Sequence, residues 1–311
     1  MRRIVLIGLL CYAALLFPQT SVQIISYNVE NLFHPSSDSL HNDYDFTPEG
    51  NHHWTFARYR EKLAHIGQVV ANIGGWNTPA LIGLEEIENE QCLIDLCRWG
   101  VLSNYKYQYL HHDSPDERGI DCALLYQPKQ FKLLAHTFLP VPTDNRPTRD
   151  IVYACGQLHN NDTLHIFLCH FPSQRGGTTA TNSRRAIAQA TLQTALDSLL
   201  QTQPTAKIVV MGDFNMAPAQ QFAPLHNLML DFEEQGNGTY KWHGVWSCLD
   251  HFYVSQNILP YVSIDIFCPA WLLQDDLQYL DKKPFRTYQG YKYVGGYSDH
   301  LPIYLTVNLP Q

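Results

Sequence analysis

The sequence predicts an α/β or α+β sandwich, in which mixed β-strands pack with a few helices between them. Short apolar runs rich in β-branched residues recur along the chain, and amphipathic segments with helical spacing separate some of them. No linker-like stretch or internal repeat divides residues 21–311, so we expect one domain. A hydrophobic fraction of 45 % with 16 % charged residues excludes a disordered chain.

The strands are expected where apolar and β-branched residues run between turn-forming residues. "ALIGL" and "AKIVVMG" are continuously apolar, as in strands that are buried on both faces. The expected strands cover 22–27, 80–84, 105–110, 120–126, 131–137, 150–157, 163–169, 206–212, 248–255, 262–267 and 301–307.

Two amphipathic helices are expected from apolar residues that recur at steps of three and four. The first covers 56–73, with Thr55 as its N-cap and Gly74-Gly75 as its stop, and the second runs from 182 to about 200. A shorter, more polar helix is expected at 90–99, and the polar segment 34–54 reads as a long loop.

The first twenty residues differ from the rest. Arg2 and Arg3 precede an apolar run over 4–17 that is too short to span a bilayer, and small polar residues follow it. This pattern predicts a secretory signal at 1–20, a mature domain at 21–311, and a secreted or periplasmic protein without a stable membrane span. The alternative is a buried first strand or helix, although the run carries no polar face to support one.

Cysteine content and net charge bear on two further expectations, disulfide bonds and the binding of polyanions. The chain has eight cysteines, and Cys92 and Cys97 are close enough in sequence for a local bridge, which the sequence leaves open. The formal charge is −8. Such a protein repels polyanions unless positive charge is local or is supplied by a bound cation.

Polar side chains cluster at the ends of several expected strands. Each alone is a common way to stop a strand, but the carboxylates are costly to bury together unless a cation neutralises them. Oxygen ligands suit Mg²⁺, Mn²⁺ or Ca²⁺, and histidines beside them suit proton transfer and charge stabilisation during attack on a phosphate ester. The polar residues at or near the ends of the expected strands are Asn28, Glu30, Glu85, Glu86, His170, Asp213, Asn215, Asp250, His251, Asp299 and His300.

Seven segments in chain order resemble the endonuclease/exonuclease/phosphatase superfamily: "SYNVENL", "LIGLEEIEN", "RGIDCALLY", "CHFPSQRGG", "MGDFNMAP", "CLDHFYVS" and "GYSDHLPIYL". The resemblance spans nearly all of the expected mature chain. It implies a deoxyribonuclease I-like four-layer sandwich, two packed mixed β-sheets flanked by helices. It also implies hydrolysis of phosphate esters with a divalent metal.

The resemblance also implies roles for individual residues. Asn28, Glu86 and Asp299 match the metal ligands, with Glu85 as the rival of Glu86. Asp213 and Asn215 match groups that orient the attacking water and hold a phosphate oxygen. His300 matches the histidine that contacts the scissile phosphate, Asp250 its carboxylate partner, and His170 the second histidine of the site. Which group is the general base stays open.

Three further residues are candidates for substrate binding. Arg118 either reaches a substrate phosphate or pairs with Asp116 or Glu117. Arg175 lies in a glycine-rich basic loop after His170, which fits phosphate handling or a solvated turn. Tyr288 belongs to "FRTYQGYKY", whose aromatic and cationic residues suit base stacking along a nucleic acid, or ordinary packing.

The favoured function is a secreted phosphoesterase that cleaves nucleic acid phosphodiesters by metal-assisted in-line attack of water. The first alternative is a sphingomyelinase-like or inositol-phosphatase-like hydrolase of a lipid head group or phosphorylated small molecule. It ranks lower because no clearly apolar hairpin for membrane contact is visible in the sequence. The second is an inactive binding protein, against which the intact motifs argue. No obligate protein partner is implied.

Overall fold

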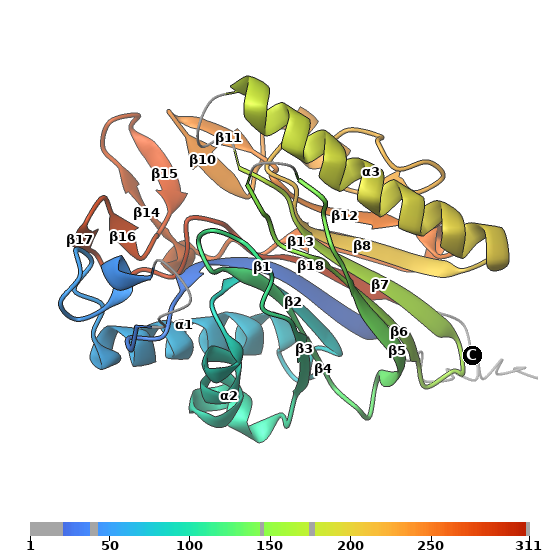
Figure 1. Cartoon of the computed structure of the whole chain (residues 1–311), viewed down its shortest axis with the longest axis horizontal. Helices are drawn as coiled ribbons and strands as arrows, with labels where there is room; N and C mark the ends of the chain where they lie inside the picture. The colour runs from blue at the N-terminus through green and yellow to red at the C-terminus, as the bar shows by residue number, and fades with distance from the viewer. Residues whose placement is uncertain (1–20, 38–42, 144–145, 174–177, 309–311) are drawn as a thin grey trace, which may run out of the picture.

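The computed structural model describes residues 21–37, 43–143, 146–173 and 178–308, and side chains from 182 onward in the last range. The expected signal at 1–20 lies outside the described residues, as does Arg175. Most of the described chain folds into two six-stranded mixed sheets with helices on their outer faces (Figure 1).

The first sheet has the strand order β13-β18-β1-β2-β4-β3, and the second has the order β5-β6-β7-β8-β12-β9. Each contains one central parallel pair, β1 with β2 and β7 with β8, among antiparallel neighbours. The strands of the first sheet are β1 (Val22–Leu32), β2 (Leu81–Ile87), β3 (Gln108–His111), β4 (Asp121–Tyr126), β13 (Val262–Ile266) and β18 (Ile303–Val307). Those of the second are β5 (Lys132–Leu139), β6 (Ile151–Gln157), β7 (Thr163–His170), β8 (Lys207–Asp213), β9 (His226–Asn227) and β12 (Asp250–Val254).

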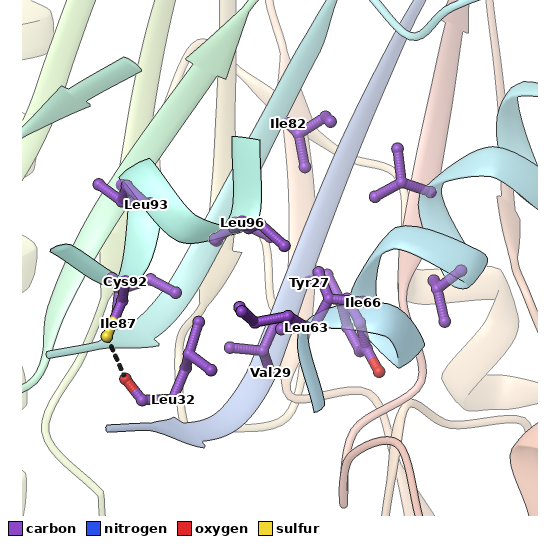
Figure 2. Packing of buried hydrophobic residues seen from close by; sticks show 14 of the residues in the cluster. Tyr27, Val29, Leu32, Leu63, Ile66, Ile82, Ile87, Cys92, Leu93 and Leu96 are labelled. Atoms are coloured by element: carbon purple, nitrogen blue, oxygen red, sulfur yellow. Dashed lines mark hydrogen bonds between the residues drawn. The ribbon is translucent and has the colours of Figure 1, made fainter. Parts of the chain in front are cut away.

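Three apolar clusters fill the spaces between four layers. The inner faces of the two sheets meet in one cluster, which includes Leu81 and Met211. Helices α1 (Phe56–Gly74) and α2 (Glu90–Arg98) cover the outer face of the first sheet, where Leu63 and Leu93 are buried (Figure 2). Helix α3 (Thr178–Thr202) covers the second sheet through Leu192 and its neighbours. The expected four-layer sandwich is therefore confirmed.

Local signals placed the boundaries of α1 and α2 to within one residue, whereas α3 begins at Thr178, before the expected start at 182. The Thr55 side chain accepts a hydrogen bond from the Arg58 backbone N–H, which satisfies one of the unpaired donors of the first turn of α1. The loop expected at 34–54 contains only a short 3-10 helix, η1 (Tyr44–Phe46). Other short helices are η2 (Gly100–Asn104), η3 (Leu259–Tyr261), η4 (Ala270–Leu272) and α4 (Leu230–Glu234).

Three small hairpins were not predicted from the sequence. They pair β10 (Tyr240–Trp242) with β11 (Val245–Ser247), β14 (Leu273–Asp276) with β15 (Asp281–Pro284), and β16 (Tyr288–Gln289) with β17 (Lys292–Tyr293). Their strands are only two to four residues long, too short for a clear alternation of apolar and polar residues.

The cysteines in the described part of the chain are all free, so Cys92 and Cys97 form no bridge. Cys92 instead donates from its thiol to the backbone carbonyl of Leu32 at 3.5 Å (Figure 2). Among the described residues, no helix is both long enough and apolar enough to cross a membrane.

Candidate active site

The ends of the central strands of both sheets meet at one edge of the sandwich. Asn28 and Glu86 lie near the ends of the parallel strands β1 and β2, and His170 and Asp213 are the last residues of β7 and β8. Asp250 starts β12 directly opposite Asp213 in the antiparallel ladder. The polar strand ends seen in the sequence therefore converge, as expected for parallel strands of packed sheets.

A bulge in the first sheet decides which glutamate faces the site. The ladder pairs Asn28 with Glu85 and resumes with Leu32 and Ile87, so three residues of β1 stand opposite Glu86 alone. Glu86 adopts a left-handed backbone conformation with φ 68°, and Glu30 and Asn31 have φ 56° and 54°. In a regular strand, successive side chains point to opposite faces of the sheet. The bulge breaks this alternation and turns the Glu86 side chain toward the edge of the sandwich where the strand ends meet.

A cleft of about 660 Å³ lies at this edge. Its lining contains most of the residues predicted to act there. They are Asn28, Glu86, Arg118, His170, Asp213, Asn215, Asp299 and His300. Asp250 lies behind His300 and is fully buried. Glu85 is also fully buried and accepts a hydrogen bond from the Ser26 hydroxyl at 3.0 Å, away from the cleft lining.

Glu86 is held as an anion. Nη1 and Nη2 of Arg118 each lie 3.4 Å from its Oε1, and the Asn31 backbone N–H donates to its Oε2 at 2.8 Å. Burial would raise the pKa of Glu86, but Arg118 and then His170 outweigh it and hold the pKa at about 2. The Arg118 guanidinium therefore pairs with Glu86 and the Asn31 side chain, and not with Asp116 or Glu117.

Asp213 lies at the centre of the site. Its Oδ2 accepts hydrogen bonds from the side-chain amides of Asn28 at 3.0 Å and Asn215 at 3.2 Å. The Nε2 atoms of His170 and His300 lie 3.7 and 3.8 Å from the same oxygen. Burial raises the pKa of Asp213 to about 7, against the lowering effect of His300. A carboxylate with a pKa near neutrality suits a general base.

Asn215 positions Asp213. Its backbone N–H donates to Asp213 Oδ1 at 2.8 Å, and its backbone adopts a left-handed conformation, φ 52°, that asparagine tolerates. Its side-chain amide donates to the Phe171 carbonyl at 2.9 Å as well as to Asp213. Both side-chain amide hydrogens are therefore engaged, which leaves the side-chain oxygen Oδ1 of Asn215 to contact a substrate or a water.

The two histidines differ in charge. His300 Nδ1 lies 2.8 Å from Asp250 Oδ2. Burial opposes its protonation, but Asp250 and then Asp213 hold the pKa of His300 well above its ordinary value. Burial and then Arg149 lower the pKa of His170, whose Nδ1 is buried without a hydrogen-bond partner. These opposite shifts favour a protonated His300 beside a neutral His170.

A buried network of charges holds the third expected metal ligand. Arg286 donates to Asp299 Oδ2 at 2.9 Å and, through Nε, to Glu30 Oε1 at 3.2 Å. The Lys62 ammonium, from α1, donates to the Thr287 hydroxyl and the Tyr297 carbonyl at 2.6 Å each. These contacts tie helix α1 to the segment 286–299, which contributes both Arg286 and Asp299 to the cleft.

The residues around Glu86 fit a hard divalent cation. Asn28, Glu86 and Asp299 supply one amide and two carboxylate oxygens to the same cleft, and Glu86 is ionised. Arg118 and Arg286 each pair with one of the two carboxylates, Glu86 and Asp299. The carboxylates of Asp213 and Asp250 also lie close to a nitrogen of His300. Because Asp250 bonds the protonated His300, this second group reads as an acid–base cluster.

Tyr288 is not an open stacking surface. Only 7 % of it is exposed, its hydroxyl donates to the His52 carbonyl at 2.8 Å, and its ring packs against His52 and Trp54. It lines a neighbouring pocket of about 400 Å³ that shares Asn31, Arg118 and Arg286 with the cleft. Tyr288 therefore offers little open ring surface for the predicted stacking, because its ring packs inward at the β16–β17 hairpin.

Sequence reasoning missed several residues of the cleft. Asn31, Ser173, Tyr240, Trp242, Ser247 and Leu249 also line it. Tyr240 packs its ring against that of His300, with centroids 4.9 Å apart. Lys62 was missed as well. It lies next to Leu63 in the helix predicted at 56–73, and a lysine that is buried requires polar or charged partners, which was a usable signal.

A family model matches almost the whole chain and not only the residues of the cleft. Residues 23–309 match the model of the endonuclease/exonuclease/phosphatase family. The chain belongs to this family. Its members are metal-dependent phosphoesterases. A search of curated proteins finds no match.

Solved structures of the family share the fold at low identity. D. rerio TDP2 in complex with a single-strand DNA product is 16 % identical, with a TM-score of 0.56, over 93 % of this chain and 100 % of that one. The human Nocturnin catalytic domain with bound sulfate is 15 % identical, with a TM-score of 0.56, over 92 % and 93 %. A family protein from Bacteroides thetaiotaomicron is 16 % identical, with a TM-score of 0.54, over 94 % and 99 %.

Proposed function

We propose that this family member hydrolyses phosphodiester bonds by in-line attack of a water molecule, with a nucleic acid as its substrate. The observation that carries the proposal is the arrangement around Asp213. One buried carboxylate with a raised pKa lies within 4 Å of both histidine Nε2 atoms and accepts hydrogen bonds from two amides. A catalytically dead binding protein would have no need to keep this costly cluster.

In the proposed reaction Asp213 accepts a proton from the attacking water. The water oxygen forms a bond to phosphorus while the ester oxygen on the opposite side leaves with the bonding electrons. His300, protonated beside Asp250, donates a hydrogen bond to the phosphoryl oxygen on which charge develops. Asn28 and Asn215 hold the Asp213 carboxylate in place through their amides.

Asn28, Glu86 and Asp299 would hold the cation, Mg²⁺ or Mn²⁺, with Ca²⁺ as a weaker candidate. When bound, the cation supplies positive charge to the phosphate and to the leaving oxygen. The ion pairs of Arg118 with Glu86 and of Arg286 with Asp299 would then be weaker. Both arginines could contact non-bridging phosphate oxygens. This would place local positive charge in a protein whose net charge is −8.

A nucleic acid substrate is supported by the aromatic and cationic rim of the cleft. Trp242 is 63 % exposed, and both it and Tyr240 line the same cleft as Arg118 and Arg286. Stacking on such rings tolerates any base. The solved D. rerio TDP2 with a single-strand DNA product shows that this fold can hold such a strand. Hydrolysis of a lipid head group or an inositol phosphate is the competing candidate.

The test is a hydrolysis screen with Mg²⁺ or Mn²⁺ over single-stranded DNA, RNA, phosphatidylcholine, sphingomyelin and phosphorylated inositols. We expect cleavage of a nucleic acid that falls only modestly as salt rises, because few phosphates are contacted and few counterions are released. Asp213→Asn should abolish turnover, and Asp231→Asn, on the distant helix α4, should not. Cleavage of only a lipid or inositol phosphate would overturn the substrate choice.

We also propose that the chain is exported. The support is the charged start and short apolar run of residues 1–20. N-terminal sequencing of the protein from culture medium or periplasm should find a mature start near Ser21, and an intact Met1 would contradict export.

A further inference from the structure

Two hairpins beside the cleft end in exposed apolar turns. The β10–β11 hairpin exposes 63 % of Trp242 and 65 % of Val245, and the β14–β15 hairpin exposes 83 % of Leu277 and 92 % of Leu280. Isolated exposed apolar residues are common on protein surfaces, but four large ones on two neighbouring turns require an explanation. The expectation that the chain has no clearly apolar hairpin is therefore wrong, because neither hairpin was recognised in the sequence.

The two turns form one surface. The His243 Nδ1 atom lies 3.2 Å from the Tyr279 hydroxyl. Gly244, with φ +82°, packs so closely that a Cβ atom there would lie 2.6 Å from the Tyr279 ring. Both hairpins lie at the same end of the molecule, and β10 contacts β15 (Figure 1). We call Trp242, Val245, Leu277, Tyr279 and Leu280 the apolar tip surface.

The charges of the two hairpins cancel. Their three lysines and three aspartates form three ion pairs, two of them within β14–β15 and one between the hairpins. These pairs are Lys282–Asp275 at 2.5 Å, Lys283–Asp276 at 3.4 Å and Lys241–Asp281. Binding to a polyanion requires cations that are free to contact phosphates. The two hairpins, as described, offer no unpaired lysine. Their outward-facing turns, unlike the cleft wall with its arginines, therefore fit an uncharged or zwitterionic partner better than a polyanion.

The apolar tip surface is continuous with the mouth of the cleft. Trp242 lines the cleft together with Glu86, Asp213 and His300, while its neighbours in the turn face outward. A surface in contact with the tips would therefore lie directly beside the phosphoesterase site.

We propose that the apolar tip surface docks the protein on a zwitterionic phospholipid membrane. Leu277 and Leu280 project from the turns and enter the boundary between head groups and acyl chains, and the rings of Trp242 and Tyr279 lie at the head-group level that such rings favour. The ion pairs lie in the strands behind the turns, where the Lys241 side chain is buried and the Lys282–Asp275 pair stays in water. This inference goes beyond the proposed function and does not depend on which phosphodiester is cleaved.

The test is sedimentation of the full-length mature chain with phosphatidylcholine vesicles, without divalent metal. We expect wild type to pellet with the vesicles and the double variant Leu277→Ser/Leu280→Ser to lose at least tenfold in binding. The matched control is Trp76→Ser, which removes a fully exposed tryptophan that follows helix α1. This variant should bind as wild type does. Because all three side chains are exposed, circular dichroism should show unchanged folds.

Other occupants of the surface give distinct results. Absence of vesicle binding by wild type, or equal loss in Trp76→Ser, would overturn the proposal. Light scattering that shows a wild-type dimer, dissociated by Leu277→Ser/Leu280→Ser, would assign the surface to a second copy of the chain. Loss of single-stranded DNA binding in the double variant, with no vesicle binding by wild type, would assign it to nucleic acid.

Discussion

The Nδ1 atom of His300 lies 2.8 Å from Oδ2 of Asp250, with both side chains buried. The two residues come from different sheets, since Asp250 begins β12 and His300 precedes β18. Asp250 fixes the orientation of the imidazole and helps to keep it protonated against the cost of burial. His300 Nε2 is thereby directed toward Asp213 in the cleft.

Loss of this pair should reduce turnover without unfolding the protein. We expect Asp250→Asn to lower kcat by about tenfold to a hundredfold, and His300→Ala by about a hundredfold or more, because a donor to the developing phosphoryl charge is weakened or lost. Steady-state kinetics with Mg²⁺, beside circular dichroism of each variant, measures this. Wild-type kcat in His300→Ala would contradict the role of His300.

The adjacent glutamates should respond differently to the same substitution. Glu86→Gln should weaken Mn²⁺ binding at least tenfold, measured by titration calorimetry, because it removes an ionised oxygen ligand. Burial raises the pKa of Glu85 well above its ordinary value, which favours the neutral form, and the side chain lies outside the cleft lining. Glu85→Gln should therefore leave the Mn²⁺ affinity within about threefold. Equal effects of the two variants would refute the assignment of Glu86 as a ligand.

Lys62 and Glu30 should be coupled in stability. Burial lowers the pKa of Lys62 to about 8, against the raising effect of Glu30, and burial raises that of Glu30 to about 7. Lys62→Met should cost about 3 kcal/mol of unfolding free energy in urea, since it leaves Glu30 less compensated. The double variant with Glu30→Gln should lose less than the sum of the single losses.

A surface substitution provides the control for this double-mutant cycle of Lys62 and Glu30. Lys132→Met, at an exposed position of β5, should change the unfolding free energy by less than about 0.5 kcal/mol. Strict additivity of Lys62→Met and Glu30→Gln would show that the two buried charges do not interact.

Asp121 should make stability fall as pH rises. Burial raises its folded pKa to about 7, although Ser114 donates to it through both its hydroxyl and its backbone N–H. A raised folded pKa means that the folded state binds the proton more tightly than the unfolded state. The stabilisation is therefore complete below the unfolded pKa of about 4 and is lost as pH rises through 7.

The comparison with Asp121→Asn isolates this contribution. The difference in unfolding free energy between wild type and variant should change steadily between pH 4 and 7, with the variant relatively more stable at the higher pH. Urea unfolding at four or five pH values measures it. A difference that is constant across this range would exclude Asp121 as the source.

The strands and helices could largely be predicted, because hydrophobic periodicity and capping residues act locally. Thr55 caps α1 as expected, and the strand ends carry the predicted polar residues. The short hairpins could not be predicted, since strands of two to four residues leave no periodic signal. The inward turn of Tyr288 and the apolar tips therefore became visible only in the structure.

Sequence by itself determined the layered fold and the chemical groups at the strand ends, because spacing and residue type are written along the chain. Only the tertiary structure decided how those groups are used. A bulge opposite Glu86 turned that residue, and not Glu85, toward the cleft. Arg286 and Glu30 meet across 256 residues of sequence. Such contacts depend on the packing of whole sheets, which no local pattern records.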